Sequence, residues 1–236
     1  MAKPLIIAHR GSKLRAPENT LKAFALAMAE GAQGIELDVW KCGSGELVVT
    51  HNNETAPLTG KQGLVEELSL AQLRELDFGE GEKIPTLAEV LELTASLDLL
   101  NVEIKGEKIR SRGIERDVFQ LLQKKTLLEK TVVSSFNPFI LFRLKRISSA
   151  LRLGLLFHQT SALPLRRAWA ACLLRPAFLH PESSLLTPRL ARRAQRKNQK
   201  VIAWTINNID DLDKCIALGV HGIITDDPLW AREQMK

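Results

Sequence analysis

The feature that most constrains the fold of this 236-residue chain is the alternation of short apolar segments with helical patterns along its whole length. The first apolar segment precedes a helical pattern that begins at Asn19 or Thr20, and the same order recurs to the end. The apolar segments are 5–9, 34–40, 100–105, 131–136, 151–157, 177–180, 200–206 and 222–226. Strands that alternate with helices form parallel sheets, and this number of them in one α/β chain predicts a closed (β/α)8 or TIM barrel.

Helix signals lie between most of these segments. Ser69 with Gln72, and Thr86 with Glu89, match the capping box at the start of a helix, and Pro228 suits the first turn of a final helix. Two apolar stripes are expected to face the sheet, one formed by Ile114, Val118, Leu121 and Leu122 and the other by Leu165, Trp169, Cys172 and Leu173.

Two of the predicted strands also indicate which side chains point into the barrel. In segment 34–40 the even positions Glu36 and Asp38 are polar, whereas the odd positions between them are apolar. Because side chains alternate along a strand, the apolar ones are expected to meet the outer helices. Segment 100–105 repeats the pattern, with Glu103 and Lys105 pointing inward.

Segment 46–51 does not fit the count of parallel strands. Only a few residues separate it from segment 34–40, and a parallel crossover needs a dozen or more, so the two segments must form an antiparallel hairpin. Pairing Lys41 with Glu46 sets Val39 opposite Val48 and Asp38 opposite Val49. The same register sets Glu36 opposite His51 and so brings an imidazole beside the inward carboxylates.

Composition limits the class of protein. The chain is 45% hydrophobic and 25% charged, which excludes a disordered or collagen-like protein, and no break in composition divides it, so we expect a single domain over 1–236. Its three cysteines lack CxxC spacing, which argues against a disulfide framework or zinc ribbon. Residues 1–12 lack a secretory apolar run, and the longest uncharged stretch, 153–165, is too short to span a membrane. A cytoplasmic location is expected.

Positive charge is concentrated in one part of the chain. Residues 158–200 contain nine Lys or Arg against Glu182 alone. Such residues usually form the solvated outer faces of helices, and a weak contact with an anionic membrane surface is the alternative, helped by the amphipathic stretch 164–175 around Trp169. Nucleic acid is not an expected partner, because the region lacks interleaved aromatic residues and any known motif. The oligomeric state is left open.

The predicted strand ends carry a charged constellation. Catalytic groups of TIM barrels sit at the C-terminal ends of the strands. Those ends carry His9, Arg10, Glu36, Asp38, Glu103, Lys105 and Trp204. Converging carboxylates repel one another, and their oxygens are the ligands that hard divalent cations prefer, so Mg²⁺ or Ca²⁺, or alternatively Mn²⁺, is the expected cofactor. The alternative is a network of ion pairs in which Arg10 and Lys105 alone satisfy the carboxylates.

Several strings resemble the glycerophosphodiester phosphodiesterase family, and they do so in order over nearly the whole chain. They are HRG at 9–11, PENT at 17–20, ELDV at 36–39, VVTH at 48–51, NVEIK at 101–105, SSFNP at 134–138, AWTIN at 203–207 and GIITDDP at 222–228. The combination of HRG, ELD and VEIK is specific, whereas each triplet alone is weak.

The resemblance implies a metal-dependent TIM barrel that hydrolyses glycerophosphodiesters to glycerol 3-phosphate and an alcohol. By resemblance, the metal ligands are Glu36, Asp38 and Glu103, the acid and base are His9 and His51, and the phosphate contacts are Arg10 and Lys105. Phe136 and Trp204 are expected to form a wall for the glycerol carbons, with packing inside the barrel as the alternative. Glu18 is expected to pair with Arg10, and Asn19 with Thr20 to cap a helix.

The chain departs from the family pattern after the second histidine. The family usually has Asp, a basic residue and threonines there, whereas this chain has an uncharged Asn52 and no arginine in the loop 52–60. The preferred alcohol is therefore left open, and the short segment between His51 and Leu100 favours an open site. Two other functions remain: a lysophospholipid-cleaving enzyme at a membrane surface, and a non-catalytic barrel that binds phosphodiesters.

Overall fold

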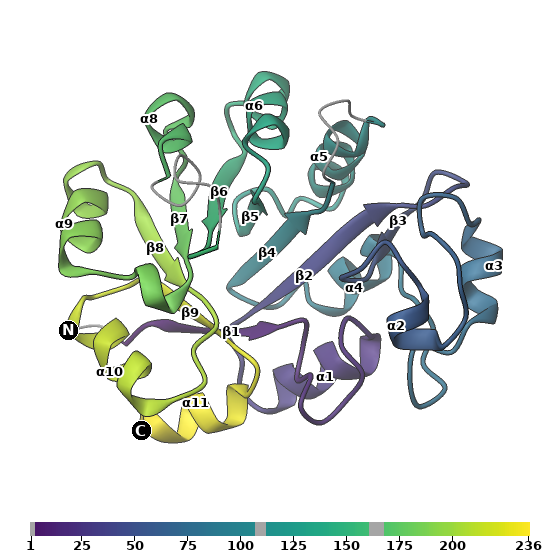
Figure 1. The fold of residues 1–236 in the computed structure, drawn as a ribbon, viewed down its shortest axis with the longest axis horizontal. Coiled ribbons are helices and arrows are strands. Elements are labelled where there is room, and N and C mark those ends of the chain that lie inside the picture. The colour runs from purple at the N-terminus through teal and green to yellow at the C-terminus, as the bar shows by residue number, and fades with distance from the viewer. Residues whose placement is uncertain (1–2, 107–111, 161–167) are drawn as a thin grey trace.

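The computed structural model describes residues 3–106, 112–160 and 168–236 and has the predicted barrel (Figure 1). The parallel strands are β1 (Leu5–His9), β2 (Gly34–Lys41), β4 (Leu99–Ile104), β5 (Thr131–Ser135), β6 (Arg152–Phe157), β7 (Phe178–Pro181), β8 (Lys200–Ala203) and β9 (Gly222–Thr225). They pair in the order β1-β9-β8-β7-β6-β5-β4-β2, and the pairing of β1 with β2 closes the barrel. All eight of the predicted barrel strands are confirmed.

Helices surround the strands in Figure 1. They are α1 (Leu21–Ala29), α4 (Leu87–Leu93), α5 (Ile114–Lys124), α6 (Pro138–Ile147), α8 (Ala170–Leu174), α9 (Pro188–Arg196), α10 (Ile209–Ala217) and α11 (Pro228–Gln234). Both predicted capping boxes are present, and Pro228 begins α11. None of the helices in the described ranges is long and apolar enough to cross a membrane.

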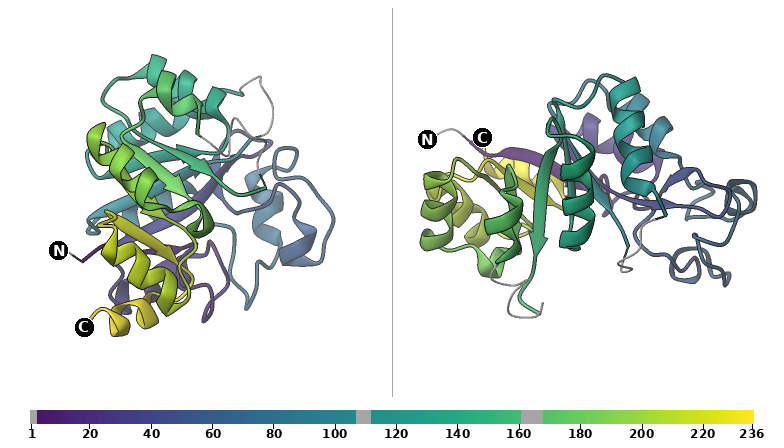
Figure 2. Two further views of the ribbon diagram at one scale, coloured as in Figure 1. Left: turned by 60° about the vertical axis from the view of Figure 1, so that its left-hand side comes forward. Right: turned by 90° about the horizontal axis from the view of Figure 1, so that it is seen from above.

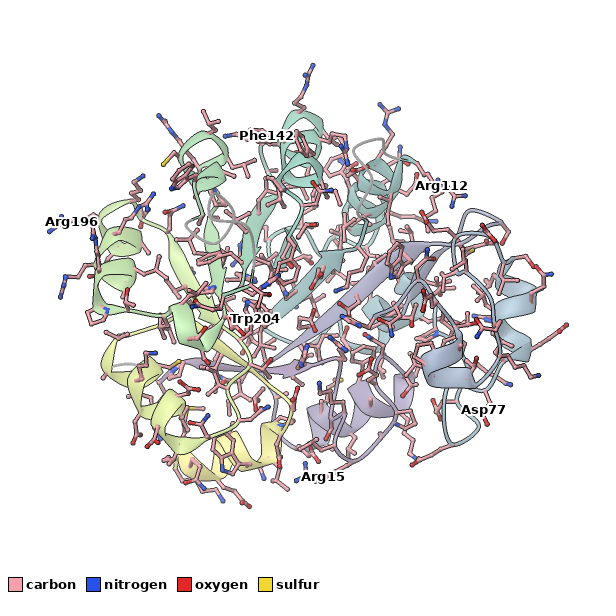
Figure 3. The ribbon with its side chains drawn as sticks, viewed as in Figure 1. Arg15, Asp77, Arg112, Phe142, Arg196 and Trp204 are labelled. Carbon is pink, nitrogen blue, oxygen red and sulfur yellow. The ribbon has the colours of Figure 1, made fainter. Side chains whose placement is uncertain are left out.

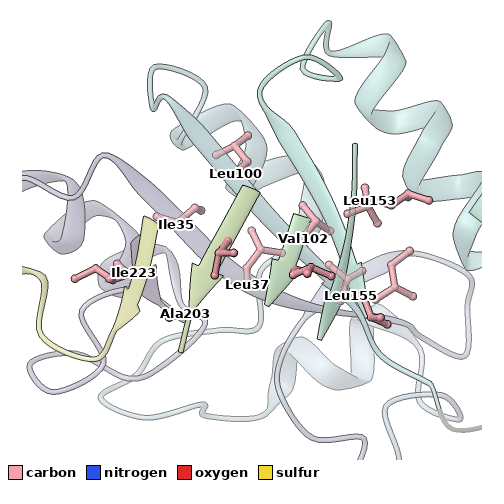
Figure 4. Packing of buried hydrophobic residues seen from close by; sticks show 14 of the residues in the cluster. Ile35, Leu37, Leu100, Val102, Leu153, Leu155, Ala203 and Ile223 are labelled. Atoms are coloured by element: carbon pink, nitrogen blue, oxygen red, sulfur yellow. The ribbon is translucent and has the colours of Figure 1, made fainter. Parts of the chain in front are cut away.

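The main core lies between the outer side of the strands and the helices. Alternate strand residues such as Ile35, Leu37, Leu100 and Val102 are buried there (Figure 4). A second, smaller cluster fills the interior of the barrel and includes Ile7, Leu99 and Phe178. Because these apolar residues occupy one end of the interior, the polar inward side chains of β2 and β4 are left at the C-terminal end.

Strand β3 (Leu47–Val49) forms the predicted antiparallel hairpin with β2, but the predicted register is wrong by one residue. Val39 pairs with Val49 and Lys41 pairs with Leu47. The observed register lets Val39 and Val49 share the buried outer face, whereas the predicted one would have placed Val49 opposite Asp38 on the polar face. β3 ends before His51, which therefore is not opposite Glu36 and approaches the mouth from the loop that follows.

The loop after β3 continues into a small region that projects beside the barrel (Figures 1 and 2). It contains the short helices α2 (Ala56–Thr59) and α3 (Leu70–Glu75). A separate apolar cluster holds it together, with Val48, Val65, Leu73 and Ile84 among its buried members. This region lies to one side of the barrel in both figures. The open site expected from the short segment between His51 and Leu100 stays a prediction.

The predicted stripe on α8 is wrong. Trp169 and Leu173 have 53% and 74% of their surface exposed and Cys172 is exposed, while Leu165 lies outside the described residues. The buried face is formed by Ala168, Ala171 and Leu174. Both faces of this segment are apolar in sequence, and the one with alanines packs inward because small side chains let a short helix lie close to the strands.

Candidate active site

Three carboxylates converge at the C-terminal end of the barrel. Glu36 and Asp38 lie on β2 and Glu103 lies on β4, where Asp38 and Glu103 are neighbours in the sheet register. All three are buried, and each offers an oxygen within 4.8 Å of the oxygens of the others. The structure therefore brings together the side chains that the sequence predicted as metal ligands.

Asp38 is held in place by the polar side chains of Asn19, Arg10 and Lys105. The Asn19 amide donates to Asp38 Oδ2 at 2.9 Å, and Arg10 Nε lies 3.2 Å from the same oxygen. Lys105 Nζ lies 2.9 Å from Asp38 Oδ1 and 2.6 Å from Glu103 Oε1. Burial opposes ionisation of Asp38, but Lys105 and Arg10 outweigh it and hold the pKa of this carboxyl below its usual range.

Glu36 and Glu103 have too little positive charge nearby to offset their burial. Burial raises the pKa of Glu103 to about 7, although Lys105 opposes the change. Burial, together with Asp38 and Glu103, raises the pKa of Glu36 well above its usual value, and Glu36 Oε2 has no hydrogen-bond partner among the described residues. The ion-pair network formed by Arg10 and Lys105 therefore does not satisfy the cluster. Buried hard oxygens with a shortage of positive charge fit a divalent cation.

The loop between β1 and α1 places Arg10 and Asn19 over the cluster. Both residues have a left-handed backbone, with φ of 57° and 59°. Gly11 between β1 and α1 also has positive φ, and a Cβ there would lie 2.6 Å from the backbone of Ala23, so only glycine fits this turn. Arg10 Nη1 donates to Glu18 at 3.1 Å, which confirms the predicted pair. Thr20 caps α1 as predicted, whereas the Asn19 side chain serves Asp38 instead.

His9, at the end of β1, has a carboxylate partner that the sequence analysis missed. Its Nδ1 lies 2.5 Å from Oδ1 of Asp226, the residue after β9. Asp226 also contacts Lys13 at 2.9 Å and accepts from the Asn207 amide at 2.8 Å. Burial lowers the pKa of His9, although Asp226 opposes the change. The only signal in the sequence was a polar residue at the end of the last predicted strand.

His51 has a different partner, the neighbouring Asn52. His51 Nδ1 lies 2.9 Å from Asn52 Oδ1, and since an amide oxygen only accepts, Nδ1 carries the hydrogen. The Trp40 indole donates to the His51 backbone oxygen at 3.2 Å and ties the loop to β2. Burial lowers the pKa of His51 although Asp38 opposes the change, so the imidazole lies within the electrostatic reach of the carboxylate cluster. Despite the wrong register, His51 therefore reaches the mouth.

Phe136 and Trp204 lie together across the mouth from β2. Their rings meet edge to face with centroids 5.5 Å apart, and Phe136 also contacts the His158 ring at 5.3 Å. The Trp204 indole donates to the backbone oxygen of His180 at 2.8 Å, and Trp204 lies near the centre of the view in Figure 3. Both rings are partly exposed, so they offer an apolar surface beside the charged cluster.

A groove of about 990 Å³ opens from one side of this site. It begins at His51, Glu103 and Lys105 and continues between the projecting region and the first turns of α5 and α6. Its lining also includes Leu64 and Phe139. The site thus combines a buried, charged centre with a wide opening on the His51 side.

Comparison with known proteins relates these residues to one family. The model of the glycerophosphoryl diester phosphodiesterase family matches residues 9–229. A glycerophosphodiester phosphodiesterase of Caldanaerobacter subterraneus subsp. tengcongensis is 38% identical over 235 residues, covering 96% of this chain and 95% of the relative. One of Bacillus altitudinis is 31% identical over 245 residues, covering 98% and 99%.

Solved structures with similar folds support the same relation. An Oleispira antarctica phosphodiesterase, in complex with the product sn-glycerol-3-phosphate, has a TM-score of 0.85 at 28% identity, covering 99% of this chain and 97% of the other. A glycerophosphodiester phosphodiesterase of Thermotoga maritima has a TM-score of 0.83 at 26% identity, covering 99% of both chains.

Proposed function

This chain belongs to the glycerophosphoryl diester phosphodiesterase family, and we propose that it cleaves glycerophosphodiesters with one divalent cation and two histidines. It is a phosphoric diester hydrolase that produces glycerol 3-phosphate. The observation that carries the proposal is the convergence of Glu36, Asp38 and Glu103 within 4.8 Å at the end of the barrel where the histidines lie. Residues 1–236 are proposed to form one catalytic domain.

The three carboxylates are the proposed ligands of the cation, with Mg²⁺, Ca²⁺ and Mn²⁺ as candidates. The bound cation would supply Lewis acidity, drawing negative charge from a phosphoryl oxygen. Arg10 and Lys105 donate to the phosphoryl oxygens as charge develops there. The carboxylates, Arg10 and Lys105 carry a formal charge of −1, or +1 with the cation, which suits a monoanionic phosphodiester.

His9 is the proposed general base. Asp226 holds the hydrogen on Nδ1, which leaves Nε2 to remove the proton from the glycerol 2-hydroxyl. That oxygen attacks phosphorus in line with the alcohol that leaves. Asp226 stabilises the imidazolium that forms on His9, as a carboxylate beside a protonated imidazole does.

His51 is the proposed general acid. Because Asn52 accepts the hydrogen on Nδ1, Nε2 of protonated His51 donates its proton to the leaving alkoxide. The cyclic phosphate that results is opened by water, with His51 taking a proton from the water and His9 returning its proton to the 2-oxygen. In the net reaction, one diester and one water molecule are converted to glycerol 3-phosphate and an alcohol. Phe136 and Trp204 would contact the glycerol carbons.

The proposal is tested by measuring release of glycerol 3-phosphate from glycerophosphocholine and glycerophosphoethanolamine, with and without EDTA. Wild type should lose activity in excess chelator and regain it with one of the three cations. His9→Ala should lose almost all turnover. Full activity in chelator would refute the metal role, unchanged turnover in His9→Ala would refute the base, and no turnover by wild type on any diester would favour a non-catalytic barrel.

A second candidate is cleavage of lysophospholipids at a membrane surface. It is favoured by the exposure of Trp169, which precedes α8, and of Leu173 on α8. This segment lies beside the basic helix α9, where Arg193 Nη2 lies 3.4 Å from Cys172 Sγ. Figure 3 shows Arg196 of α9 extending outward from the barrel wall. Arg166 and Arg167, which belong to the predicted amphipathic stretch 164–175, lie outside the described residues. Co-sedimentation with anionic liposomes at low and high salt tests the contact, and absence of binding at both would remove it.

A further inference from the structure

The groove beside the active site reaches the carboxylate cluster on the His51 side. Its lining includes His51, Glu103 and Lys105 but not His9, Arg10 or Trp204. Under the proposed function His51 protonates the leaving alkoxide, so the groove starts where the alcohol departs. At about 990 Å³ it reaches the upper end of the range of about 300–1,000 Å³ that is typical of pockets for drug-sized ligands. Choline or ethanolamine would fill only a small part of it.

Apolar side chains form much of the groove wall. Trp40 lies near the end of β2, Leu64 belongs to the projecting region, and Phe136, Phe139 and Ile140 come from the end of β5 and the start of α6. Phe139 has 51% of its surface exposed, and Leu64 is also exposed. Exposed aromatic and aliphatic side chains in a groove that opens from an active site gain free energy when an apolar group covers them.

The cations among the described residues that line the groove are already paired. Lys41 Nζ lies 2.6 Å from Asp117, and Arg143 Nε lies 2.6 Å from Glu115. Arg112 Nη1 lies 3.7 Å from Glu66. Because each of these described cations has a carboxylate partner, this part of the wall does not require an anionic alcohol.

We propose that this groove binds the leaving alcohol and favours neutral alcohols with an apolar chain of several carbons. The inference rests on the proposed function. The substrates would be glycerophosphodiesters in which one ester carries a free glycerol and the other an apolar alcohol, including a glycerol that bears an acyl chain. The free glycerol supplies the attacking hydroxyl on the His9 side. The bond between phosphorus and the apolar alcohol breaks, one water is consumed, and glycerol 3-phosphate and the neutral alcohol are released.

The test uses a homologous series, sn-glycero-3-phosphomethanol, -butanol and -octanol, each below its micelle concentration and without vesicles. Complete burial of one methylene is worth about fourfold in affinity, so a groove open on one side should give about twofold per carbon. We expect kcat/KM for glycerol 3-phosphate release to rise at least about tenfold from the methyl to the octyl diester. Using the ratio within each protein cancels differences in the fraction of folded enzyme.

Three variants locate the effect. Phe139→Ser and Leu64→Ser should both bring the ratio of octyl to methyl kcat/KM toward one. Ile209→Ser, at a comparably exposed position on α10 outside the groove, should keep the wild-type ratio. A wild-type ratio near one with active turnover of the methyl diester would overturn the inference and leave the proposed function standing. An equal fall of the ratio in Ile209→Ser would also overturn it, and no turnover of any diester would remove the proposed function itself.

Discussion

The two sides of the active site differ in what holds their histidine and in how far they open to solvent. On one side His9 contacts a carboxylate, Asp226, that is further fixed by Lys13 and Asn207. On the other side the His51 ring contacts the amide oxygen of Asn52 through Nδ1, and a groove of about 990 Å³ begins beside it. Both imidazoles are oriented through Nδ1, yet only one has a charged partner.

This difference matches the roles that the two histidines have in the proposed mechanism. A carboxylate stabilises a protonated imidazole, which suits a base that must accept a proton from a weakly acidic hydroxyl. An amide oxygen fixes the orientation of the ring but carries no net charge, so it stabilises the imidazolium less than a carboxylate does, which suits an acid that must release a proton. The enclosed side then holds glycerol, the part shared by all substrates, and the open side receives the part that varies.

The largest effect is expected from Glu36→Gln, since both sides of the site depend on the carboxylate cluster. Loss of one ligand should reduce kcat by about 10³-fold or more, because the cation would contribute several kcal/mol at the transition state. Titration calorimetry with Mn²⁺ should show weaker binding in the variant. Glu92→Gln, at an exposed position on α4, is the control. Wild-type turnover and Mn²⁺ affinity in Glu36→Gln would show that Glu36 is not a ligand.

The next prediction separates the two histidines by their leaving groups. On glycerophosphoethanolamine, His9→Ala and His51→Ala should each lose about 10²–10⁴-fold in kcat. On the 4-nitrophenyl diester, His51→Ala should recover most of its loss, because nitrophenolate leaves without protonation. His9→Ala should not recover. Equal losses by both variants on both substrates would remove the difference between acid and base, and His221→Ala, at the opposite end of the barrel, serves as the control.

The smallest expected effect is a shift in pH dependence. Burial lowers the pKa of both histidines. His9 acts deprotonated, so its lowered pKa moves the acidic limb of kcat/KM to lower pH; His51 acts protonated, so its lowered pKa moves the alkaline limb the same way. The bell-shaped profile of kcat/KM against pH should therefore be centred at a lower pH than a profile set by two unperturbed imidazoles of pKa about 6.5.

Asn52→Asp would give His51 a carboxylate partner, as His9 has in Asp226, and so tests this prediction more sharply. The new carboxylate should raise the pKa of His51 and move the alkaline limb up by about one unit, with the acidic limb unchanged. Asn198→Asp, far along the chain at the end of α9, is the control and should leave both limbs in place. If only the acidic limb moved in Asn52→Asp, His51 would be the base and His9 the acid, the reverse of the proposed roles.

The order of the barrel strands and their positions to within about three residues could be predicted because their signals are local. Apolar runs, alternation along a strand and capping boxes depend on residues within a few positions of one another, and each predicted strand and both boxes are present. The same local signals gave the wrong answer where the sequence fits two arrangements almost equally well, either two strand registers or two buried helix faces. The hairpin of β2 and β3 shifted by one residue, and α8 buries its alanines instead of the larger stripe.

Sequence alone determined which polar residues share the inward face, since alternation on β2 and β4 is set by the backbone and by the burial of the outward residues. Tertiary structure alone decided the partners of those residues. His9 and Asp226 are 217 positions apart in the chain and meet because β9 pairs with β1 as the barrel closes. The groove likewise exists only where the projecting region and α6 approach the end of β4, and no local pattern encodes a distance between segments that are far apart in sequence.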